Sequence, residues 1–205
     1  MTRARENADG ARLDAPLASP AFTGTPTGIT AAHITSGVLP VGVTGGSGLD
    51  AVSAGKVLQV VQTAFVGTGS TTNSTDWTDA LLSTTITPSA TSSKVLIMVS
   101  VNMSSATTNI TAYYRIDRAG TTIFVPATAG NRKLTAAMVR TPSDGTMLNS
   151  NSIYLDSPST TSATIYKIEW RVQSGTGYFN RAGDDSNEVQ IARAASSLTL
   201  IEIGA

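Results

Sequence analysis

This chain has few residues of the types that act in catalysis, and their spacing in the sequence does not indicate an active site. His33 is the single histidine, and no carboxylate lies close to it in sequence. General acid–base catalysis and nucleophile activation both need such a partner. We expect His33 to be an outward-facing polar residue, although several copies around an oligomer axis could bind an anion or a metal. The sequence predicts no catalytic residue and a protein that is not an enzyme.

Two glycine-containing segments carry ligand-like patterns that stop short of a known site. Residues 183–188 (GDDSNE) supply oxygens suited to calcium, but their glycine does not fall at the sixth position of an EF-hand loop. Residues 45–48 (GGSG) lack the lysine and the helix start of a phosphate-binding loop. Sequons begin at Asn73, Asn102 and Asn109, as chance allows in a chain rich in Ser and Thr. We expect solvated turns at both segments, and neither a cofactor nor a metal.

The overall composition indicates what kind of element holds these residues. Only 14% of the 205 residues are charged, and Thr, Ser, Gly and Ala dominate the remainder, which favours exposed β-rich or extended structure over long helices. The 14 basic and 14 acidic residues cancel, so we expect no nucleic acid partner. There is no cysteine, so burial and oligomerisation must supply the stability. The N-terminus has no apolar run behind it and no segment approaches a membrane span, which predicts cytoplasmic assembly without membrane insertion.

Residues 15–55 form a segment of Pro, Gly, Thr and Ser with single apolar residues spaced through it. No window holds a period of 3.6 or 2.0, and one copy could not bury enough apolar surface to offset its ordering entropy. Several copies wound together would solve that problem; a flexible tether is the alternative. The residues that we expect at the interface between copies are Leu17, Phe22, Ile29, Ile34, Val38 and Leu39.

After Gly55 the pattern changes to that of strands separated by turns. We expect strands at residues 56–62, 81–86, 94–103, 111–117, 121–125, 134–140, 153–155, 164–172, 178–180 and 197–203, with an exposed loop at 67–75. Such a series of short strands is typical of an antiparallel β-sandwich, here jelly-roll-like. The sequence therefore predicts an all-β protein with a head domain at residues 56–205.

Two of these strands define the expected core. Residues 94–103 (KVLIMVSVNM) are apolar on both faces, which predicts a central strand covered by the core on one side and by a second sheet or subunit on the other. Residues 164–172 alternate strictly, and we expect their apolar set in the core and their charged set in water. The core set is Tyr166, Ile168, Trp170 and Val172, and the charged set is Lys167, Glu169 and Arg171.

A few polar and aromatic residues near turns are candidates for contact with a partner, because exposed aromatic rings often grip sugar and protein surfaces. Trp77 lies between Asp76 and Asp79 after a polar loop, so it is either an exposed contact or partly buried under that loop. The candidate contacts are Trp77, Asn131, Arg132, Tyr178 and Asn180.

Residues 15–27 (APLASPAFTGTPT) are similar to a segment common in the stalks of bacteriophage tail fibre proteins. Residues 34–40 (ITSGVLP) and 45–49 (GGSGL) resemble the connector before the fibre head, although Val43-Thr44 replaces the usual Ala-Arg. In the head, residues 55–61, 86–96 and 195–202 resemble C-terminal domains of phage tail proteins.

The resemblance implies a homotrimeric structural protein of the virion. Its N-terminal segment, residues 1–14, would dock on a tail or baseplate protein, residues 15–55 would form an extended trimerising stalk, and the head would bind a glycan or protein of the host surface. Arg3, Arg5 and Arg12 could pair with acidic groups at the docking site or simply be solvated. The alternatives are a baseplate or capsid decoration protein that contacts only virion subunits, and a depolymerase tailspike, which would need a parallel β-helix and paired carboxylates.

Overall fold

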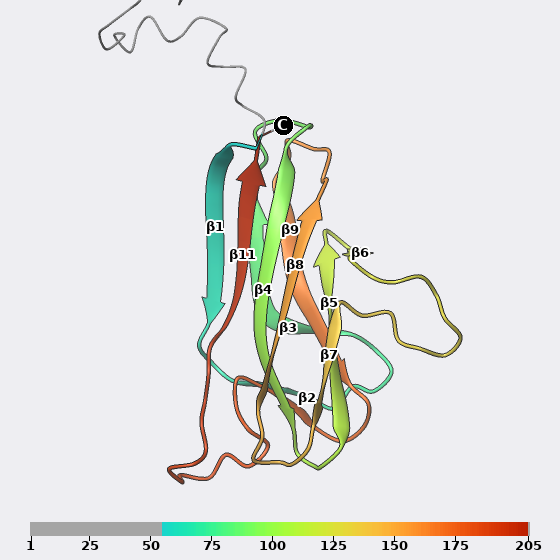
Figure 1. Cartoon of the computed structure of the whole chain (residues 1–205), viewed down its shortest axis with the longest axis vertical. Coiled ribbons are helices and arrows are strands. Elements are labelled where there is room, and N and C mark those ends of the chain that lie inside the picture. Colours follow the sequence, from blue (N-terminus) through green and yellow to red (C-terminus); the bar gives the residue numbers. More distant parts are fainter. Residues whose placement is uncertain (1–54, 205) are drawn as a thin grey trace, which may run out of the picture. The chain divides into compact units, whose positions relative to one another are not determined.

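The computed structural model describes residues 55–204, in which every regular element is a β-strand (Figure 1). All paired strands are antiparallel. Sheet A contains β1 (Val57–Phe65), β2 (Gly69–Thr71), β4 (Lys94–Ser105), β8 (Leu148–Asp156), β10 (Gly177–Phe179) and β11 (Ser196–Ile203). Sheet B contains β3 (Thr78–Ile86), β5 (Ile110–Arg118), β6 (Thr121–Ile123), β7 (Ala137–Thr141) and β9 (Thr164–Val172). The prediction of an all-β, antiparallel fold is confirmed for these residues.

The expected docking segment and nearly all of the expected stalk lie outside the described residues. This applies to the docking residues Arg3, Arg5 and Arg12, and to His33. It applies equally to the expected interface residues Leu17, Phe22, Ile29, Ile34, Val38 and Leu39.

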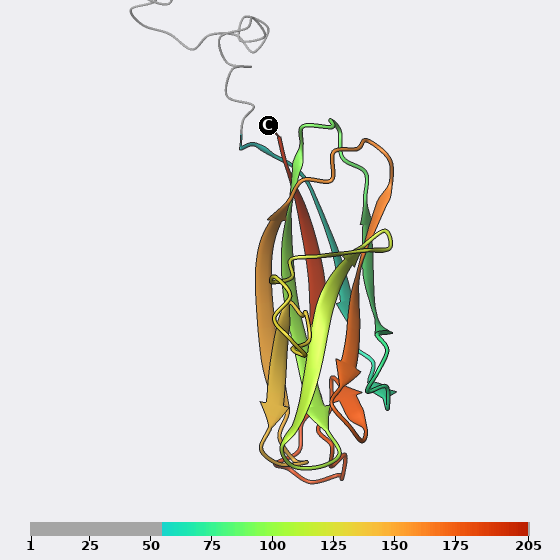
Figure 2. The same ribbon diagram turned by 90° about the vertical axis from the view of Figure 1, so that its right-hand side faces the viewer.

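The two sheets face each other across one apolar core (Figure 2). The strand β1 packs beside β3 at one side of this arrangement, and β8 packs beside β7 at the other. Trp170, Tyr114 and Phe179 are among the largest fully buried side chains, and the Trp170 and Phe179 rings meet edge to face with their centroids 5.4 Å apart. The predicted core face of residues 164–172 is confirmed, because all four of its apolar side chains belong to this core.

Strand β4 is central in sheet A, as its sequence predicts. It pairs with β11 and β10 along one edge and with β8 along the other. Val95, Ile97 and Val99 point into the core, whereas Met98, on the opposite face, is 40% exposed. That opposite face is therefore open around Met98, whereas nearer the end of β4 the segment after β10 covers it, since the side chains of Asn102 and Ser104 are buried and donate to the Ala195 and Arg181 carbonyls.

Several elements differ from the sequence-based prediction. Strand β2 lies inside the expected loop at 67–75, β7 begins only at Ala137, and β8 runs over nine residues where only 153–155 were expected. The first half of β8 (LNSNS) has low β-propensity, yet it continues the ladder with β4 as far as Leu148–Met103. Pairing with a buried neighbour thus overrides local preference.

The two ends of the described chain lie together at one end of the sandwich. The Gly55 amide donates to the Gly204 carbonyl at 2.7 Å, and the Gly204 amide donates to the Lys56 carbonyl at 2.8 Å. The opposite end carries the connections β4–β5, β7–β8, β9–β10 and β10–β11 (Figure 1). We call this the loop end. No helix that could cross a membrane occurs among residues 55–204.

Candidate functional site

The longest connection at the loop end, residues 180–195, is anchored by Asn180. This residue has a left-handed backbone (φ 62°) and is fully buried. Its side-chain amide donates to the carbonyls of Phe65 at 2.7 Å and Gly67 at 2.9 Å, and its carbonyl oxygen accepts from the Ser196 hydroxyl at 2.5 Å. The expectation that Asn180 contacts a receptor is therefore wrong, because no part of its side chain reaches the surface.

The neighbouring Tyr178 is partly exposed, and a guanidinium covers its ring. The Arg181 guanidinium carbon lies 3.6 Å from the Tyr178 ring centroid, within cation–π range. A second group of Arg181 contacts, to the Ala182 carbonyl at 3.2 Å and to Asp185 at 3.7 Å, holds the guanidinium in place. The pair presents a flat cationic surface at the start of the 180–195 connection.

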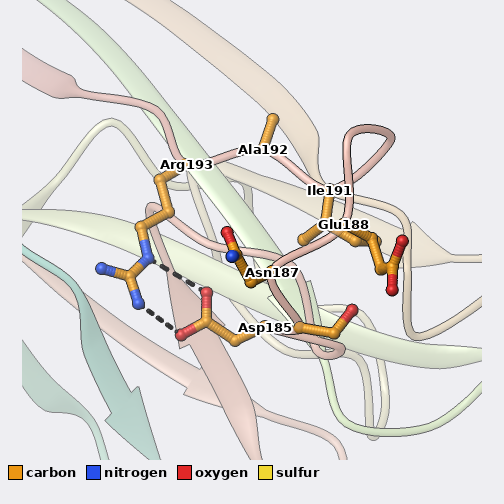
Figure 3. A pocket seen from close by; sticks show the side chains of 7 residues that line it. Asp185, Asn187, Glu188, Ile191, Ala192 and Arg193 are labelled. Atoms are coloured by element: carbon orange, nitrogen blue, oxygen red, sulfur yellow. Dashed lines mark hydrogen bonds and ion pairs between the residues drawn. The ribbon is translucent and has the colours of Figure 1, made fainter.

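Further along this connection an ion pair borders an open hollow of about 380 Å³. Arg193 donates two hydrogen bonds to the Asp185 carboxylate, at 3.0 and 2.6 Å, and these bonds lower the pKa of the Asp185 carboxyl. Figure 3 shows this pair on one side of the hollow and Glu188 on the other. Ser186 and Asn187 complete the polar lining. The site offers uncharged donors and acceptors beside charged ones, which suits hydrogen bonding to a polar partner.

The acidic side chains of residues 183–188 do not converge on a point where a calcium ion could bind. Asp184 accepts from the Ser186 amide at 3.0 Å, which closes a local turn, and Asp185 is engaged by Arg193. Within the described range no three acidic or histidine side chains are arranged to hold a metal ion.

The Trp77 side chain is half-buried and lies over the outer face of sheet B. Its ring centroid is 4.6 Å from the Arg115 guanidinium carbon and 5.9 Å from that of Arg171. Arg171 also donates to the Thr75 carbonyl at 2.6 Å. The loop before β3 is thereby tied down across β5 and β9. Of the two alternatives for Trp77, partial burial is the one observed.

This covering corrects the expectation that the charged face of residues 164–172 is in water. Glu169 is only 9% exposed and Arg171 only 4%. Glu169 pairs with Arg115 at 2.6 Å and with Lys167 at 3.2 Å. Alternation marks which residues share a face, but Trp77, more than 90 residues away in sequence from Glu169 and Arg171, lies over the part of this face where those two side chains are buried, while Ile165 at its other end is 43% exposed.

Asn131 and Arg132 are exposed in the connection between β6 and β7, on a different part of the fold from Tyr178. Arg132 donates only to the Ala129 carbonyl, at 3.3 Å. The structure therefore does not unite the five expected contact residues into one surface.

An apolar hollow of about 570 Å³ near this connection was not expected from sequence. Strand β6 ends at Ile123, and Phe124 takes a left-handed backbone (φ 53°) that turns its ring onto Tyr154, with ring centroids 4.9 Å apart. The sequence had placed Phe124 inside a strand. The hollow depends on the left-handed backbone of Phe124, which the sequence does not predict. Residues with such backbone conformations are often found at functional sites.

At the end where the chain enters, two buried carboxylates are saturated by fixed partners. Asp156 accepts both 2.8 Å contacts of Arg118 and a 2.7 Å hydrogen bond from the Tyr166 hydroxyl. Burial and the Asp156 hydrogen bond raise the pKa of Tyr166. Because every group of this cluster is taken up by a structural contact, the cluster pins β5, β8 and β9 together.

Glu202 is the second of these carboxylates. It accepts from the Ser89 amide at 2.7 Å, from the Ser89 hydroxyl at 2.6 Å and from the Gln59 amide at 2.5 Å. Burial alone would raise the pKa of Glu202, but these hydrogen bonds outweigh it and lower the pKa to about 2. Glu202 thereby joins β11 to β1 and to the β3–β4 connection.

Comparison of the sequence with known protein-family models and with curated proteins found no match.

Proposed function

We propose that this chain is a structural bacteriophage tail fibre protein, a homotrimer that docks on the tail or baseplate through its N-terminal segment. Residues 15–55 form its stalk, and a jelly-roll-like head binds a glycan or protein of the host surface. The resemblance of residues 15–49 to fibre stalks motivates the proposal.

The observation that carries the proposal is that the two ends of the sandwich formed by residues 55–204 differ. The chain enters and its last strand ends at one end of the sandwich, where Gly55 and Gly204 are hydrogen-bonded. The opposite end carries the connections, including the polar hollow beside Asp185 and Arg193. A domain tethered at one end and free at the other presents its loops outward, and binding residues are disproportionately found on loops held by a rigid scaffold.

The loop end offers the chemistry that a glycan requires. Sugar hydroxyls pair with mixed donors and acceptors such as Ser186, Asn187 and Glu188, and the Tyr178–Arg181 pair adds an aromatic and cationic surface nearby. The partner's identity follows from this surface only as a class, a polar molecule at the host envelope.

Binding of labelled full-length protein to host cells and to phage-resistant mutants tests the proposal. We expect saturable binding that is lost on resistant cells, and a loss of at least about tenfold in affinity for the double variant Asn187→Ala/Glu188→Ala, about 1.4 kcal/mol. The matched control, Thr161→Ala/Ser162→Ala, changes exposed polar residues of the β8–β9 connection at the opposite end.

Absence of binding by an intact trimer contradicts the host-binding role and favours the baseplate or capsid decoration protein. Equal loss in both double variants, or in neither, contradicts the assignment of recognition to the loop end.

A further inference from the structure

The outer face of sheet A carries exposed apolar side chains in register across four strands. In one row Val60, Ile201, Leu96 and Leu155 lie side by side, and in the next row Met98 lies beside Ile153. We call these six residues the apolar patch. Four of them are 40–63% exposed: Met98, Leu155, Val60 and Ile153.

This face departs from what an antiparallel sheet normally shows to water. Such sheets alternate between an apolar inner face and a polar outer face. The outer face of sheet B differs, because Arg115, Lys167 and Glu169 form ion pairs there and its exposed apolar residues Met138 and Ile165 are not neighbours in register. Single exposed apolar residues are ordinary, but a contiguous set marks an interaction surface.

The charge and size of the patch restrict what can cover it. Neither row of the patch contains a charged residue, and the same face continues toward the loop end with the uncharged Ser100, Asn151 and Ser197. In the next row toward the chain ends lies Lys94, which donates to the Ser157 hydroxyl at 2.8 Å. A hollow of about 320 Å³ lies among Met98, Ile153 and these polar residues. A charged partner gains nothing from the two rows of the patch, whereas copies that meet through these rows bring no like charges together within them.

The apolar patch is too small to hold two free copies together by itself. Four strands about 4.8 Å apart and two rows of side chains, which span about four residues of about 3.3 Å each along a strand, make roughly 250 Å². A standard interface takes about 800 Å² from each partner. The patch therefore forms the apolar centre of a contact whose rim is the polar part of the same face, and a linkage between the copies must raise their effective concentration.

The chain ends supply that linkage on this sheet. Both β1, the first strand after residue 55, and β11, the last strand, belong to sheet A, and the Val57–Ile203 pair lies next to the first row of the patch. If residues 15–55 join three copies, a premise that rests on the proposed function, the heads are held together at the patch end of sheet A. We propose that the outer face of sheet A is the surface through which each head contacts two further copies of this chain.

Single cysteine variants of the full-length protein test the proposal, because the chain has no cysteine of its own. Met98→Cys and Ile153→Cys place a thiol on the patch, and Met138→Cys places one on the outer face of sheet B, where Met138 is 60% exposed. We expect alkylation of the two patch thiols to be at least about tenfold slower than that of Met138→Cys in the native protein. A bifunctional thiol reagent should link copies of Ile153→Cys and should leave Met138→Cys unlinked.

The solution mass separates failure of this proposal from failure of the proposed function. A trimer whose patch and control thiols react equally fast overturns the assignment of this face and leaves the trimer intact. A monomeric mass overturns both the linkage and the contact. Protection without cross-linked copies also overturns the proposal, because another part of the same chain then covers the face. Host binding by the Met138→Cys protein shows in each case whether the loop end still works.

Discussion

At the scale of single residues, buried polar side chains at both ends of the sandwich hold connections that are remote in sequence. Asn180 ties the start of the 180–195 connection to the β1–β2 connection, and Glu202 ties β11 to the β3–β4 connection. These side chains supply hydrogen bonds where the ladders end and backbone groups would otherwise be unpaired. Removing one of them leaves its buried partners unsatisfied, which costs more than the bond itself contributes.

Replacement of Asn180 should destabilise the head, because this buried side chain holds the start of the 180–195 connection. Asn180→Ala leaves the Phe65 and Gly67 carbonyls unpaired and puts alanine, which tolerates a left-handed backbone less well than asparagine, at φ 62°, so we expect the free energy of unfolding to fall by about 3 kcal/mol. Asn180→Gly removes the same hydrogen bonds but accepts this backbone, so its loss should be smaller by about 1 kcal/mol. Urea unfolding measures both, and equal losses would contradict the role of the backbone conformation.

Glu202 should make stability depend on pH in the acid range. Its folded-state pKa of about 2 lies below the ordinary value of 4.5, so its contribution is fully present above about pH 4.5 and is lost as the pH falls through 2. We expect this contribution to be on the order of 2 kcal/mol. Urea unfolding between pH 2 and 7 should show a shallower acid loss for Glu202→Gln than for the wild type. Parallel curves for the two proteins would contradict the assignment.

At the scale of elements, the 180–195 connection is positioned by close packing at its start. A β-carbon added at Gly183 would overlap the backbone carbonyl oxygen of Ser105 and would crowd that of Asp144. Neither obstacle is a flexible side chain, so the connection itself must shift. The connection carries the polar hollow, and its start therefore controls the geometry of the loop end.

Gly183→Ala should lower the free energy of unfolding by about 1–3 kcal/mol, the usual cost of overpacking, and should weaken host-cell binding. The matched control is Gly145→Ala, whose β-carbon meets nothing closer than the Ile191 Cδ1 at 3.7 Å. Thermal unfolding and the cell-binding measurement should leave the control within error of the wild type. Host binding by Gly183→Ala at wild-type strength would argue against recognition through this connection.

At the scale of the whole molecule, the two outer faces of the sandwich differ. Sheet B presents ion pairs beside Trp77 and the separate exposed side chains of Met138 and Ile165, whereas sheet A presents the contiguous apolar patch. If copies meet through sheet A, the stability of the assembled protein depends on that face and not on sheet B.

Charges on the patch should therefore lower the melting temperature of the full-length protein. We expect Met98→Lys/Ile153→Lys to lose at least about 4 °C, since 1 kcal/mol corresponds to about 2–4 °C in a chain of this size. The control, Met138→Lys/Ile165→Lys, changes residues of similar exposure on sheet B and should move the melting temperature by less than about 2 °C. Calorimetry at several protein concentrations measures both, and equal shifts would show that the patch is ordinary surface.

The sequence by itself determined the local and periodic features of residues 55–204. Alternation with period two identified most strands and the core face of β9, because successive side chains of a strand point to opposite faces whatever the strand pairs with. The Gly120 turn between β5 and β6 was also readable, since it joins neighbours in sequence. Among the described strands, β5 and β6 are the only consecutive ones that pair, so the other pairings could not be derived from short connections.

Only the tertiary structure decided which faces and which polar residues are buried. Met98 is exposed although its strand is apolar on both faces, and Arg171 is buried although its face is charged. Asn180 lies in the interior, where it donates to the Phe65 and Gly67 carbonyls. These partners are more than 110 residues away in sequence, so its burial could not be predicted. Periodicity shows which residues share a face of a strand. The residues that cover this face come from distant parts of the chain, so a local sequence pattern cannot predict whether the face is buried.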